Sequence, residues 1–336
     1  MFRLVRCCRF LKKLFIRLNI SLGFIERCLG ESGYHKGFTM TSVYIVLSIL
    51  LIVSAFAILK KTYWLIHDTS HPPRSNSELP ENMPFRYRLF CFRSSRKLTL
   101  QAIEYIPNQP PKGTVLAFHY LGGSKTAIYP YIEGLLKAGF TIVSFDYPNH
   151  GESEAQRRNR YTLEDDMKLF LKEVQKRGIQ GPYGTFGFSM GATLAFSAAD
   201  CLPELKAIAI DSGPLIYVKD YFQYVLRNKN IKNKLTRIVF LFFYLHIIGF
   251  YRMSRRMVKR LKRLRGLPVL MFHSKKDNII SYKNAVYAYD QIKSDRVEFI
   301  SVDRSHHMTN RVLLGKAYDE KVREFFKKWL VENEER

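Results

Sequence analysis

A serine framed by glycines occupies the middle of residues 187–191, where the chain reads Gly-Phe-Ser-Met-Gly around Ser189. The apolar run 183–188 predicts a strand up to this point, and the Ala-rich run after it predicts a helix. A turn this tight strains the dihedrals of the serine and leaves no room for neighbouring side chains, which explains the glycines. The pattern predicts that Ser189 is a nucleophile for an acyl carbonyl.

A serine hydroxyl attacks only when a base takes its proton, so a histidine and an orienting carboxylate must accompany Ser189. Asp277 follows the predicted strand 268–273, at the carboxyl end where ligands gather in open α/β sheets. Asp211, after the preceding predicted strand, is the competitor for the acid role. We expect Asp277 to be the acid.

A doublet of histidines, His306 and His307, follows the next predicted strand, 296–302. We expect one of the two to be the base and the other to have no catalytic role. The base therefore also arrives at the end of a strand, after the serine and the aspartate along the chain.

Strand-like and helix-like runs alternate through the globular part of the chain. The predicted strands are 98–106, 114–119, 140–146, 183–188, 207–211, 268–273 and 296–302. The predicted helices are 125–138, 163–177, 190–201, 282–292 and 313–333. This alternation, with continuous apolar strands, predicts an α/β fold whose mostly parallel sheet has helices on both faces.

Together these motifs resemble the α/β-hydrolase superfamily, specifically its serine esterases, lysophospholipases, monoacylglycerol-lipase-like members and serine aminopeptidase-like hydrolases. The resemblance covers roughly residues 98–329. Residues 119–124 (HYLGGS) look like the family's His-Gly-x-Gly oxyanion loop. Residues 145–153 (FDYPNHGES) are similar to its Asp-x-x-Gly-His-Gly-x-Ser segment.

The resemblance implies the α/β-hydrolase fold and places one oxyanion-binding N–H on Leu121. The other comes from Met190, because the N-terminus of a helix presents its free N–H groups to an oxyanion beside Ser189. The run Ser-x-His-Met-Thr favours His307 as the base, with His306 as the alternative.

The chain departs from the family pattern at two positions. Tyr120 and Asn149 stand where the family usually has glycine. A side chain at Tyr120 narrows the oxyanion loop. We expect His119 and His150, in the same two motifs, to order their loops and not to act as catalysts.

Residues 41–59 contain no charged side chain, and their number suits a helix that crosses about 30 Å of hydrocarbon. We therefore expect a single-pass transmembrane anchor at 39–66, with Lys60, Lys61, Tyr63 and Trp64 at the membrane interface. A cleaved signal peptide is the alternative, although the apolar run is longer than usual for one and no small-residue cleavage site follows it.

The segment 1–38 carries eight basic and two acidic residues and predicts an amphipathic helix on anionic lipid. With translation from Met1, these charges favour a cytoplasmic N-terminus and an enzyme on the far side of the membrane. With Met40 as the start, Lys60 and Lys61 favour the reverse orientation. Both orientations stay open.

The net charge of +25 is concentrated in two stretches, 1–38 and 219–265. The second stretch flanks the apolar run 238–251, which is too short to span a bilayer but suits a helix at its surface or over an apolar pocket. The basic flanks would hold it against anionic headgroups. A cap that simply packs on the domain is the alternative. Interleaved apolar residues and the lack of a recognised module argue against nucleic-acid binding.

The domain boundaries follow from these patterns. A linker rich in proline and serine, 67–84, separates the anchor from an α/β-hydrolase core at 85–213 and 268–336, and 214–267 is a cap insertion. The five cysteines indicate neither a disulfide framework nor a metal site, and no cofactor is expected.

We therefore expect a membrane-anchored serine hydrolase that cleaves a carboxylic ester or thioester of a lipophilic acyl substrate through an acyl-enzyme on Ser189. The alternatives are a noncatalytic membrane scaffold that keeps the fold and a hydrolase of small peptides.

Overall fold

The computed structural model describes residues 40–75, 78–156, 162–264, 266–292 and 294–332. The chain divides into two compact units, Met1–Ala57 and Ile58–Arg336. The basic segment 1–38 expected to lie on lipid falls outside the described residues. The fold and the site described below belong to the second unit.

The apolar run near the N-terminus forms helix α2 (Met40–Ser70). Its portion Val43–Ser70 has a mean hydropathy of 2.5 in its most apolar window and is long enough to cross a membrane, and none of that window is buried inside the protein. In the described chain, Lys234–His246 and Phe250–Leu261 meet the same test only as a pair bent by 50°. The anchor was expected to end at residue 66 and the linker to begin at residue 67. Because α2 continues to Ser70, this border lies inside the helix.

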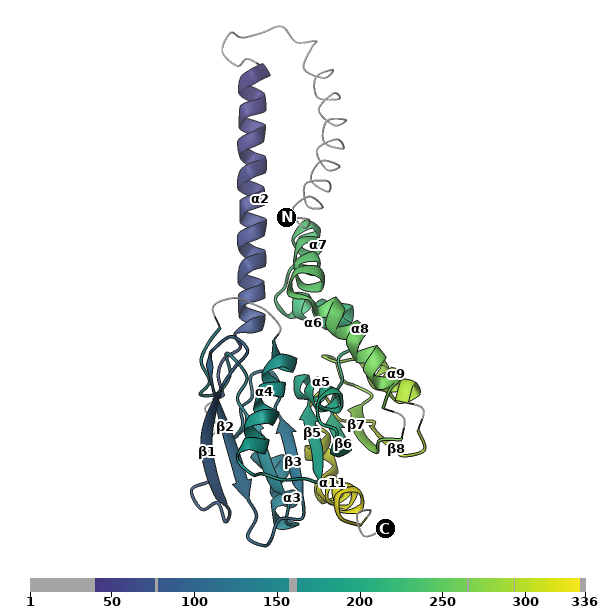
Figure 1. Ribbon diagram of the computed structural model, residues 1–336. Coiled ribbons are helices and arrows are strands. Elements are labelled where there is room, and N and C mark those ends of the chain that lie inside the picture. Colours follow the sequence, from purple (N-terminus) through teal and green to yellow (C-terminus); the bar gives the residue numbers. More distant parts are fainter. Residues whose placement is uncertain (1–39, 76–77, 157–161, 265, 293, 333–336) are drawn as a thin grey trace. The chain divides into compact units, whose positions relative to one another are not determined.

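Eight strands form one sheet in the order β1-β2-β4-β3-β5-β6-β7-β8 (Figure 1). They are β1 (Arg86–Arg93), β2 (Thr99–Ile106), β3 (Thr114–Phe118), β4 (Thr141–Phe145), β5 (Tyr183–Phe188), β6 (Leu205–Asp211), β7 (Val269–Ser274) and β8 (Val297–Val302). The β1–β2 and β2–β4 pairs are antiparallel and the others are parallel. All side chains of β3, β4, β5 and β7 are buried, as expected for strands covered on both faces.

Seven of these strands match the predicted ones to within about two residues at each end, but β1 was missed. Its sequence, RYRLFCFR, has three basic residues among eight, and only Phe90 and Phe92 of the strand are buried. It lies at the edge of the sheet, where one face is open to solvent, so it lacks the continuous apolar run of the central strands.

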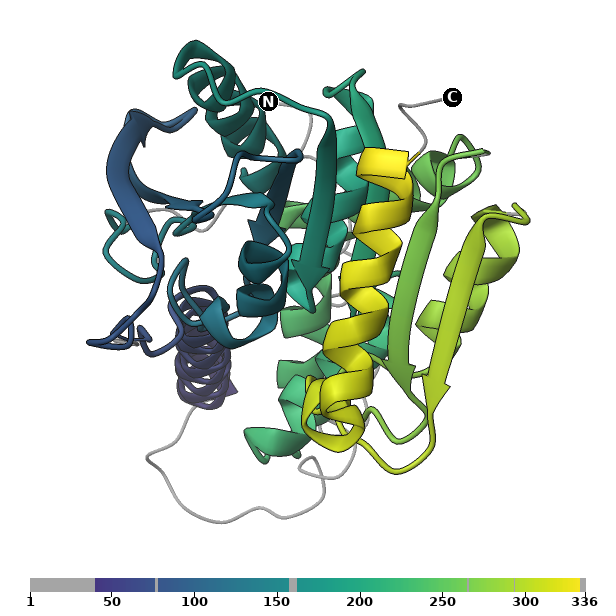
Figure 2. The same ribbon diagram turned by 90° about the horizontal axis from the view of Figure 1, so that it is seen from below.

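Helices cover both faces of the sheet. One apolar cluster packs α4 (Leu163–Lys176), α5 (Met190–Ser197), α8 (Phe250–Leu261) and α9 (Lys283–Ile292) against it, and a second packs α3 (Tyr129–Lys137) and α11 (Lys316–Lys327) on the other side. Figure 2 shows α11, in yellow, lying across its face of the sheet. The predicted α/β class, with a mostly parallel sheet between helices, is confirmed.

Three predicted helices differ from the observed ones. The helix predicted at 190–201 ends as α5 at Ser197, and a 3-10 turn covers Ala198–Asp200. The helix expected from residue 125 begins at Tyr129, where Pro130 occupies a first-turn position that needs no N–H donor. The expected C-terminal helix is divided into α10 (Asn310–Leu314), α11 and the π-helical turn η3 (Lys328–Glu332). The break falls at Gly315, whose φ of 56° cannot continue a right-handed helix.

Between β6 and β7 the chain forms α6 (Val218–Asn228), α7 (Lys234–Phe242), the π-helical turn η2 (Phe243–Ile248) and α8. Arg260 of α8 is 4% exposed and joins this insertion to the core. Its guanidinium donates to Glu164 of α4 at 3.2 Å and to Asp200, after α5, at 2.6 Å. Arg263, nearby in the chain, is 69% exposed at its side chain and lies 3.8 Å from Asp200.

We expect Arg260→Ala to lower the free energy of unfolding by about 3 kcal/mol, because it removes the buried cation between Glu164 and Asp200 and leaves them only the exposed Arg256 and Arg263. The matched variant Arg263→Ala should change it by less than about 0.5 kcal/mol, since exposed ion pairs contribute little. Denaturant unfolding of the full chain in detergent measures both values. Equal losses in the two variants would contradict a structural role for the buried arginine.

Candidate active site

Ser189 lies at the turn between β5 and α5, the predicted position for a nucleophile. Its φ of 51° and ψ of −109° are unusual for a residue with a side chain. Its N–H donates to the carbonyl of Asp211 at 2.9 Å, which extends the pairing of β5 with β6. The strained turn holds Ser189 at the carboxyl edge of the sheet.

The glycines on either side of Ser189 are required by close backbone contacts. A Cβ atom at Gly187 would lie 2.4 Å from the carbonyl oxygen of Gly191, and one at Gly191 would lie 2.0 Å from the carbonyl oxygen of Phe118. These distances are far below van der Waals contact. The first turn of α5 therefore packs directly against the end of β3, and only glycine fits there.

A chain of hydrogen bonds links Ser189, His307 and Asp277. The Nε2 atom of His307 lies 2.8 Å from the Oγ atom of Ser189, and its Nδ1 atom lies 2.7 Å from Oδ2 of Asp277. The other carboxylate oxygen of Asp277 accepts the N–H groups of Ile279 and Ile280, each at 2.9 Å. An ionised carboxylate can only accept, so Nδ1 of His307 carries the proton and Nε2 accepts from Ser189.

The sequence offered two histidines for the base, His306 and His307, and two aspartates for the acid, Asp211 and Asp277. In the structure the two members of each pair make different contacts. The side chain of His306 is exposed, and its backbone N–H donates to Thr309 Oγ1 at 2.7 Å. His307, and not His306, lies between Ser189 and a carboxylate. Asp211 is fully buried and makes its contacts elsewhere.

Asp211 organises the loop that carries His307. One carboxylate oxygen accepts from Ser212 Oγ at 2.8 Å and from Asn310 Nδ2 at 2.6 Å, and the other accepts from the hydroxyl of Tyr318 at 2.8 Å. Ser212 Oγ in turn accepts the N–H of Met308 at 3.0 Å. Burial raises the pKa of Asp211. Sequence reasoning missed Ser212, Asn310 and Tyr318, because no motif marks them and the contacts that join the two segments link residues 96 to 107 positions apart.

The two residues expected to supply oxyanion-binding N–H groups, Leu121 and Met190, both line the pocket that contains Ser189. Met190 is the first residue of α5, so its N–H has no carbonyl partner within the helix. Leu121 belongs to the loop after β3. Both residues therefore border the same pocket as Ser189, and their role as oxyanion donors stays a prediction.

His119 orders the loop that contains Leu121. Its buried ring stacks on Tyr147 with 3.8 Å between centroids, its Nδ1 donates to the carbonyl of Tyr120 at 2.8 Å, and its Nε2 accepts the N–H of Tyr147 at 3.3 Å. Burial holds its pKa well below the usual value, so the ring is neutral. This agrees with the expected loop-ordering role.

His150 and Asn149 follow in the second predicted motif. His150 Nδ1 donates to the carbonyl of Pro148 at 2.9 Å, and burial lowers its pKa. Its buried Nε2 has no partner among the described residues. Asn149 has a φ of 70°, which asparagine tolerates better than most residues and which explains why glycine is the usual alternative there.

A buried ion pair supports the two loops that contain His119 and His150. Lys125 Nζ lies 2.9 Å from Oδ2 of Asp146 with side-chain exposures of 3% and 0%. Asp146 also accepts the backbone N–H groups of Lys125, at 2.6 Å, and Glu152, at 2.9 Å. Asp146 belongs to the second motif, whereas no sequence pattern marks Lys125 as its partner.

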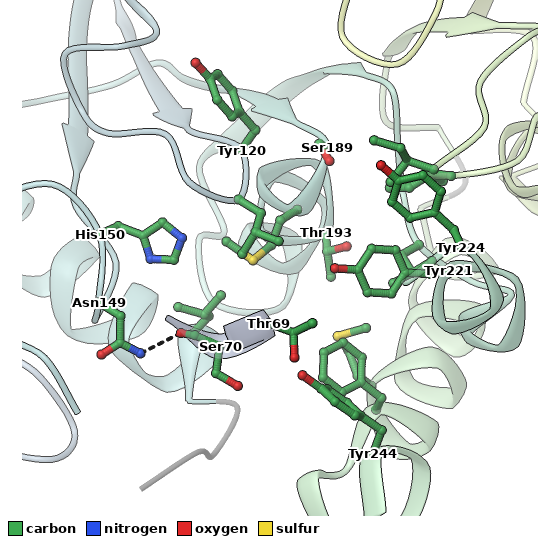
Figure 3. Close-up of a pocket in the computed structure, with 18 of the residues that line it drawn as sticks. Thr69, Ser70, Tyr120, Asn149, His150, Ser189, Thr193, Tyr221, Tyr224 and Tyr244 are labelled. Carbon is green, nitrogen blue, oxygen red and sulfur yellow. Dashed lines mark hydrogen bonds between the residues drawn. The ribbon is translucent and has the colours of Figure 1, made fainter. Parts of the chain in front are cut away.

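Ser189 opens into a pocket of about 430 Å³ (Figure 3). Most of its lining is apolar or aromatic and comes from the cap and from the loops after the strands: Leu121, Leu163, Met190, Leu215, Tyr221, Tyr224, Tyr244, Phe250, Met253, Ile279 and Ile280. Burial raises the pKa of Tyr221 to about 12, so its phenol stays protonated. Thr69 and Ser70 of α2 also line the pocket, which sequence reasoning did not foresee.

No group of three or more His, Cys, Asp or Glu side chains among the described residues is arranged to hold a metal ion. Ser189 and His307 are placed for nucleophilic attack with proton transfer.

We expect Gly191→Ala to lower the free energy of unfolding by at least about 2 kcal/mol, because its Cβ must displace the backbone of Phe118. Gly134 is the matched position. It lies inside α3, and its Cβ would meet nothing closer than 3.9 Å. Gly134→Ala should stabilise the protein by about 0.5–1 kcal/mol. Thermal or denaturant unfolding of the full chain tests both, and a neutral Gly191→Ala would refute the close approach.

Comparison with known proteins agrees with this architecture. Residues 113–222 match the family model described as alpha/beta hydrolase fold. The esterase Pf2001 of Pyrococcus furiosus is 20% identical, with a TM-score of 0.63 over 77% of this chain and 97% of that one. No curated protein sequence matches the chain.

Two further solved structures are similar over most of their length. A thermostable carboxyl esterase from Bacillus coagulans is 17% identical, with a TM-score of 0.55 over 73% of this chain and 99% of that one. A cold-adapted esterase from an Arctic intertidal metagenomic library is 12% identical, with a TM-score of 0.55 over 76% and 98%. At these identities the likeness concerns the fold. The chain has the α/β-hydrolase fold.

Proposed function

We propose that this protein is a membrane-anchored serine hydrolase that cleaves carboxylic esters of lipophilic acyl groups, with Ser189 as nucleophile, His307 as base and Asp277 as the acid that orients the base. The observation that carries the proposal is the chain of hydrogen bonds from Ser189 Oγ through His307 to Asp277, at 2.8 Å and 2.7 Å. These are the contacts that general-base activation of a hydroxyl requires.

In the first half of the reaction, Ser189 Oγ attacks the ester carbonyl carbon while its proton passes to His307 Nε2. Asp277 stabilises the resulting imidazolium through Nδ1 and keeps its own negative charge. The tetrahedral intermediate then collapses, and His307 gives its proton to the departing alcohol oxygen. An ester between the acyl group and Ser189 remains.

In the second half, a water molecule attacks the acyl-enzyme and transfers its proton to His307, which returns it to Ser189 as the carboxylic acid leaves. The negative oxygen of each tetrahedral intermediate would accept from the N–H groups of Leu121 and Met190. In a site closed to bulk water, each such donor contributes about 3 kcal/mol to transition-state stabilisation.

The pocket supports a lipophilic acyl substrate. None of the described residues that line it is Asp, Glu, Lys or Arg. Aromatic and branched aliphatic side chains are the most frequent ones in the lining. Pockets of this kind bind apolar groups and orient them with a few polar atoms. The similar solved structures are described as esterases, which favours an ester over an amide bond.

The cap supports contact with a lipid surface. On α7, Leu235, Ile238 and Phe242 are 46–56% exposed. On α8, the basic residues Arg252 and Arg255 are exposed. Apolar side chains that enter a lipid surface beside cations that bind anionic headgroups are typical of interfacial helices. Together with the apolar helix α2, this supports a membrane location for the protein.

Ser189→Ala and His307→Ala should each lower kcat/KM on p-nitrophenyl esters at least about a thousandfold, because each removes an essential part of one catalytic unit. His306→Ala is the matched control and should stay within about twofold of the unchanged protein. The measurement uses the full chain in detergent, with labelling by a fluorophosphonate probe as a second readout.

Each alternative function predicts a different result in the same assay. Equal ester hydrolysis by the Ser189→Ala variant would refute the nucleophile. A folded protein that neither labels nor hydrolyses esters would favour a noncatalytic scaffold. Faster cleavage of small peptides than of esters would favour a peptidase.

We expect the double variant Ile238→Ser and Phe242→Ser to lose most of its activity on an ester embedded in anionic vesicles, because it removes the exposed apolar face of α7. Activity on a water-soluble short ester should be retained, since neither residue lines the pocket. The ratio of the two rates is the measurement. An unchanged ratio would mean that the cap face does not contact lipid.

A further inference from the structure

The C-terminal turns of α2, within the unit that begins at Ile58, are built into the cap. Leu65 and Ile66 are 5% and 8% exposed and belong to the same apolar cluster as Phe222, Phe240 and Tyr244. A helix that only tethered the enzyme would not need buried residues at this end. These turns are therefore part of the folded domain.

Polar contacts fix the position of this helix end. The hydroxyl of Tyr244 donates to the carbonyl of Ile66 at 3.4 Å, and Lys229 of the cap lies 3.0 Å from Asp68. Asn149 Nδ2 donates to the carbonyl of Ser70 at 2.8 Å, drawn as a dashed line in Figure 3. The helix end is thus attached to the cap on one side and to the core on the other.

Asn149 has the central place among these contacts. Its Nδ2 holds Ser70, and its Oδ1 accepts the N–H of Gln156 at 2.8 Å. A glycine at this position would keep the backbone turn but would make neither contact. The departure from the family's usual glycine is therefore matched by a contact to the end of α2 that glycine has no side chain to make.

Thr69 and Ser70 face the pocket. Both line it, and Figure 3 shows Ser189 at one side with Thr69, Ser70 and Tyr244 at the opposite side. The hydroxyl of Thr69 donates to the carbonyl of Leu65 at 2.8 Å, and that of Ser70 donates to the carbonyl of Ile66 at 2.7 Å. Since both hydroxyl hydrogens are used within the helix, this wall offers a substrate no free hydroxyl donor, which suits a hydrocarbon chain better than a polar group.

We propose that the last turn of α2 is the far wall of the acyl-binding pocket and limits the length of the acyl chain, with Asn149 as the residue that positions this wall. This inference rests on the proposed ester hydrolysis at Ser189. It gives α2 a role in substrate selection besides its proposed role as an anchor.

The test compares Thr69→Trp with the unchanged full chain in detergent, on p-nitrophenyl acetate, butyrate, decanoate and laurate. A large ring at the far wall shortens the pocket, so the ratio of kcat/KM for laurate to that for acetate should fall at least about tenfold. The matched control is Tyr63→Trp, which places the same ring on an exposed part of the same helix and should leave the ratio unchanged.

A second variant tests the positioning residue and does not depend on how Thr69→Trp folds. Asn149→Asp tolerates the same backbone conformation and can still accept from Gln156, but it cannot donate to Ser70. We expect KM for laurate to rise at least about threefold with a smaller change in kcat, and KM for acetate to change less. An equal effect on both esters would overturn the positioning role.

The outcomes separate this inference from the proposed function. If the unchanged protein hydrolyses none of the esters, the proposed function fails. If it hydrolyses them, and a folded Thr69→Trp variant keeps the same laurate to acetate ratio, the far-wall assignment fails while the esterase assignment stands. A fall in the ratio with Thr69→Trp and not with Tyr63→Trp supports the inference.

Discussion

The arrangement of the site depends on the close approach of α5 to the end of β3. Gly191 and the carbonyl of Phe118 are so near that a single additional carbon atom would not fit between them. This approach forces Ser189 into its strained turn and directs the first turn of α5 toward the pocket. Because Phe118 is the last residue of β3, the loop that contains Leu121 starts beside that same helix. One steric constraint therefore brings the proposed nucleophile and both proposed oxyanion donors together.

The parallel sheet brings the remaining two members of the proposed triad to the same edge. Asp277 and His307 follow β7 and β8. Because β6, β7 and β8 pair in parallel in this order, their carboxyl ends lie at the same edge of the sheet. The backbone N–H groups of Ile279 and Ile280 hold the carboxylate of Asp277 in place. The loop of His307 is held by the buried cluster around Asp211. The aspartate that competed for the acid role thus supports the base indirectly, through hydrogen bonds to its loop.

The cap and the end of α2 complete the pocket around this edge. Arg260 connects the cap to the core through two carboxylates. Tyr244 attaches the end of α2 to the cap, and Asn149 attaches it to the core. The wall opposite Ser189 is therefore made by a helix whose earlier part is apolar enough to cross a membrane. In this arrangement the proposed anchor and the proposed substrate pocket share one continuous helix.

Much of this protein could be predicted from its sequence, because the decisive signals are local. The spacing of apolar residues and the length of the apolar runs predicted seven of the eight strands and the apolar helix near the N-terminus. The glycines around Ser189, and the order of Asp277 and His307 after it, predicted which side chains would meet. These signals are strong because a strand-to-helix turn and the end of a strand each restrict residue types within a few positions.

Tertiary structure decided what depends on contacts between distant segments. The sequence favoured His307 over His306 only through a short motif, since the direction of each side chain depends on the loop that Asp211 and Asn310 hold. It could not place Thr69 and Ser70 in the pocket, because their local sequence is that of an ordinary helix end. Edge strand β1 was missed because six of its eight residues are exposed to solvent. Local patterns of residue types determine the secondary structure of a segment, whereas the other segments that it contacts are determined only by the packing of the whole chain.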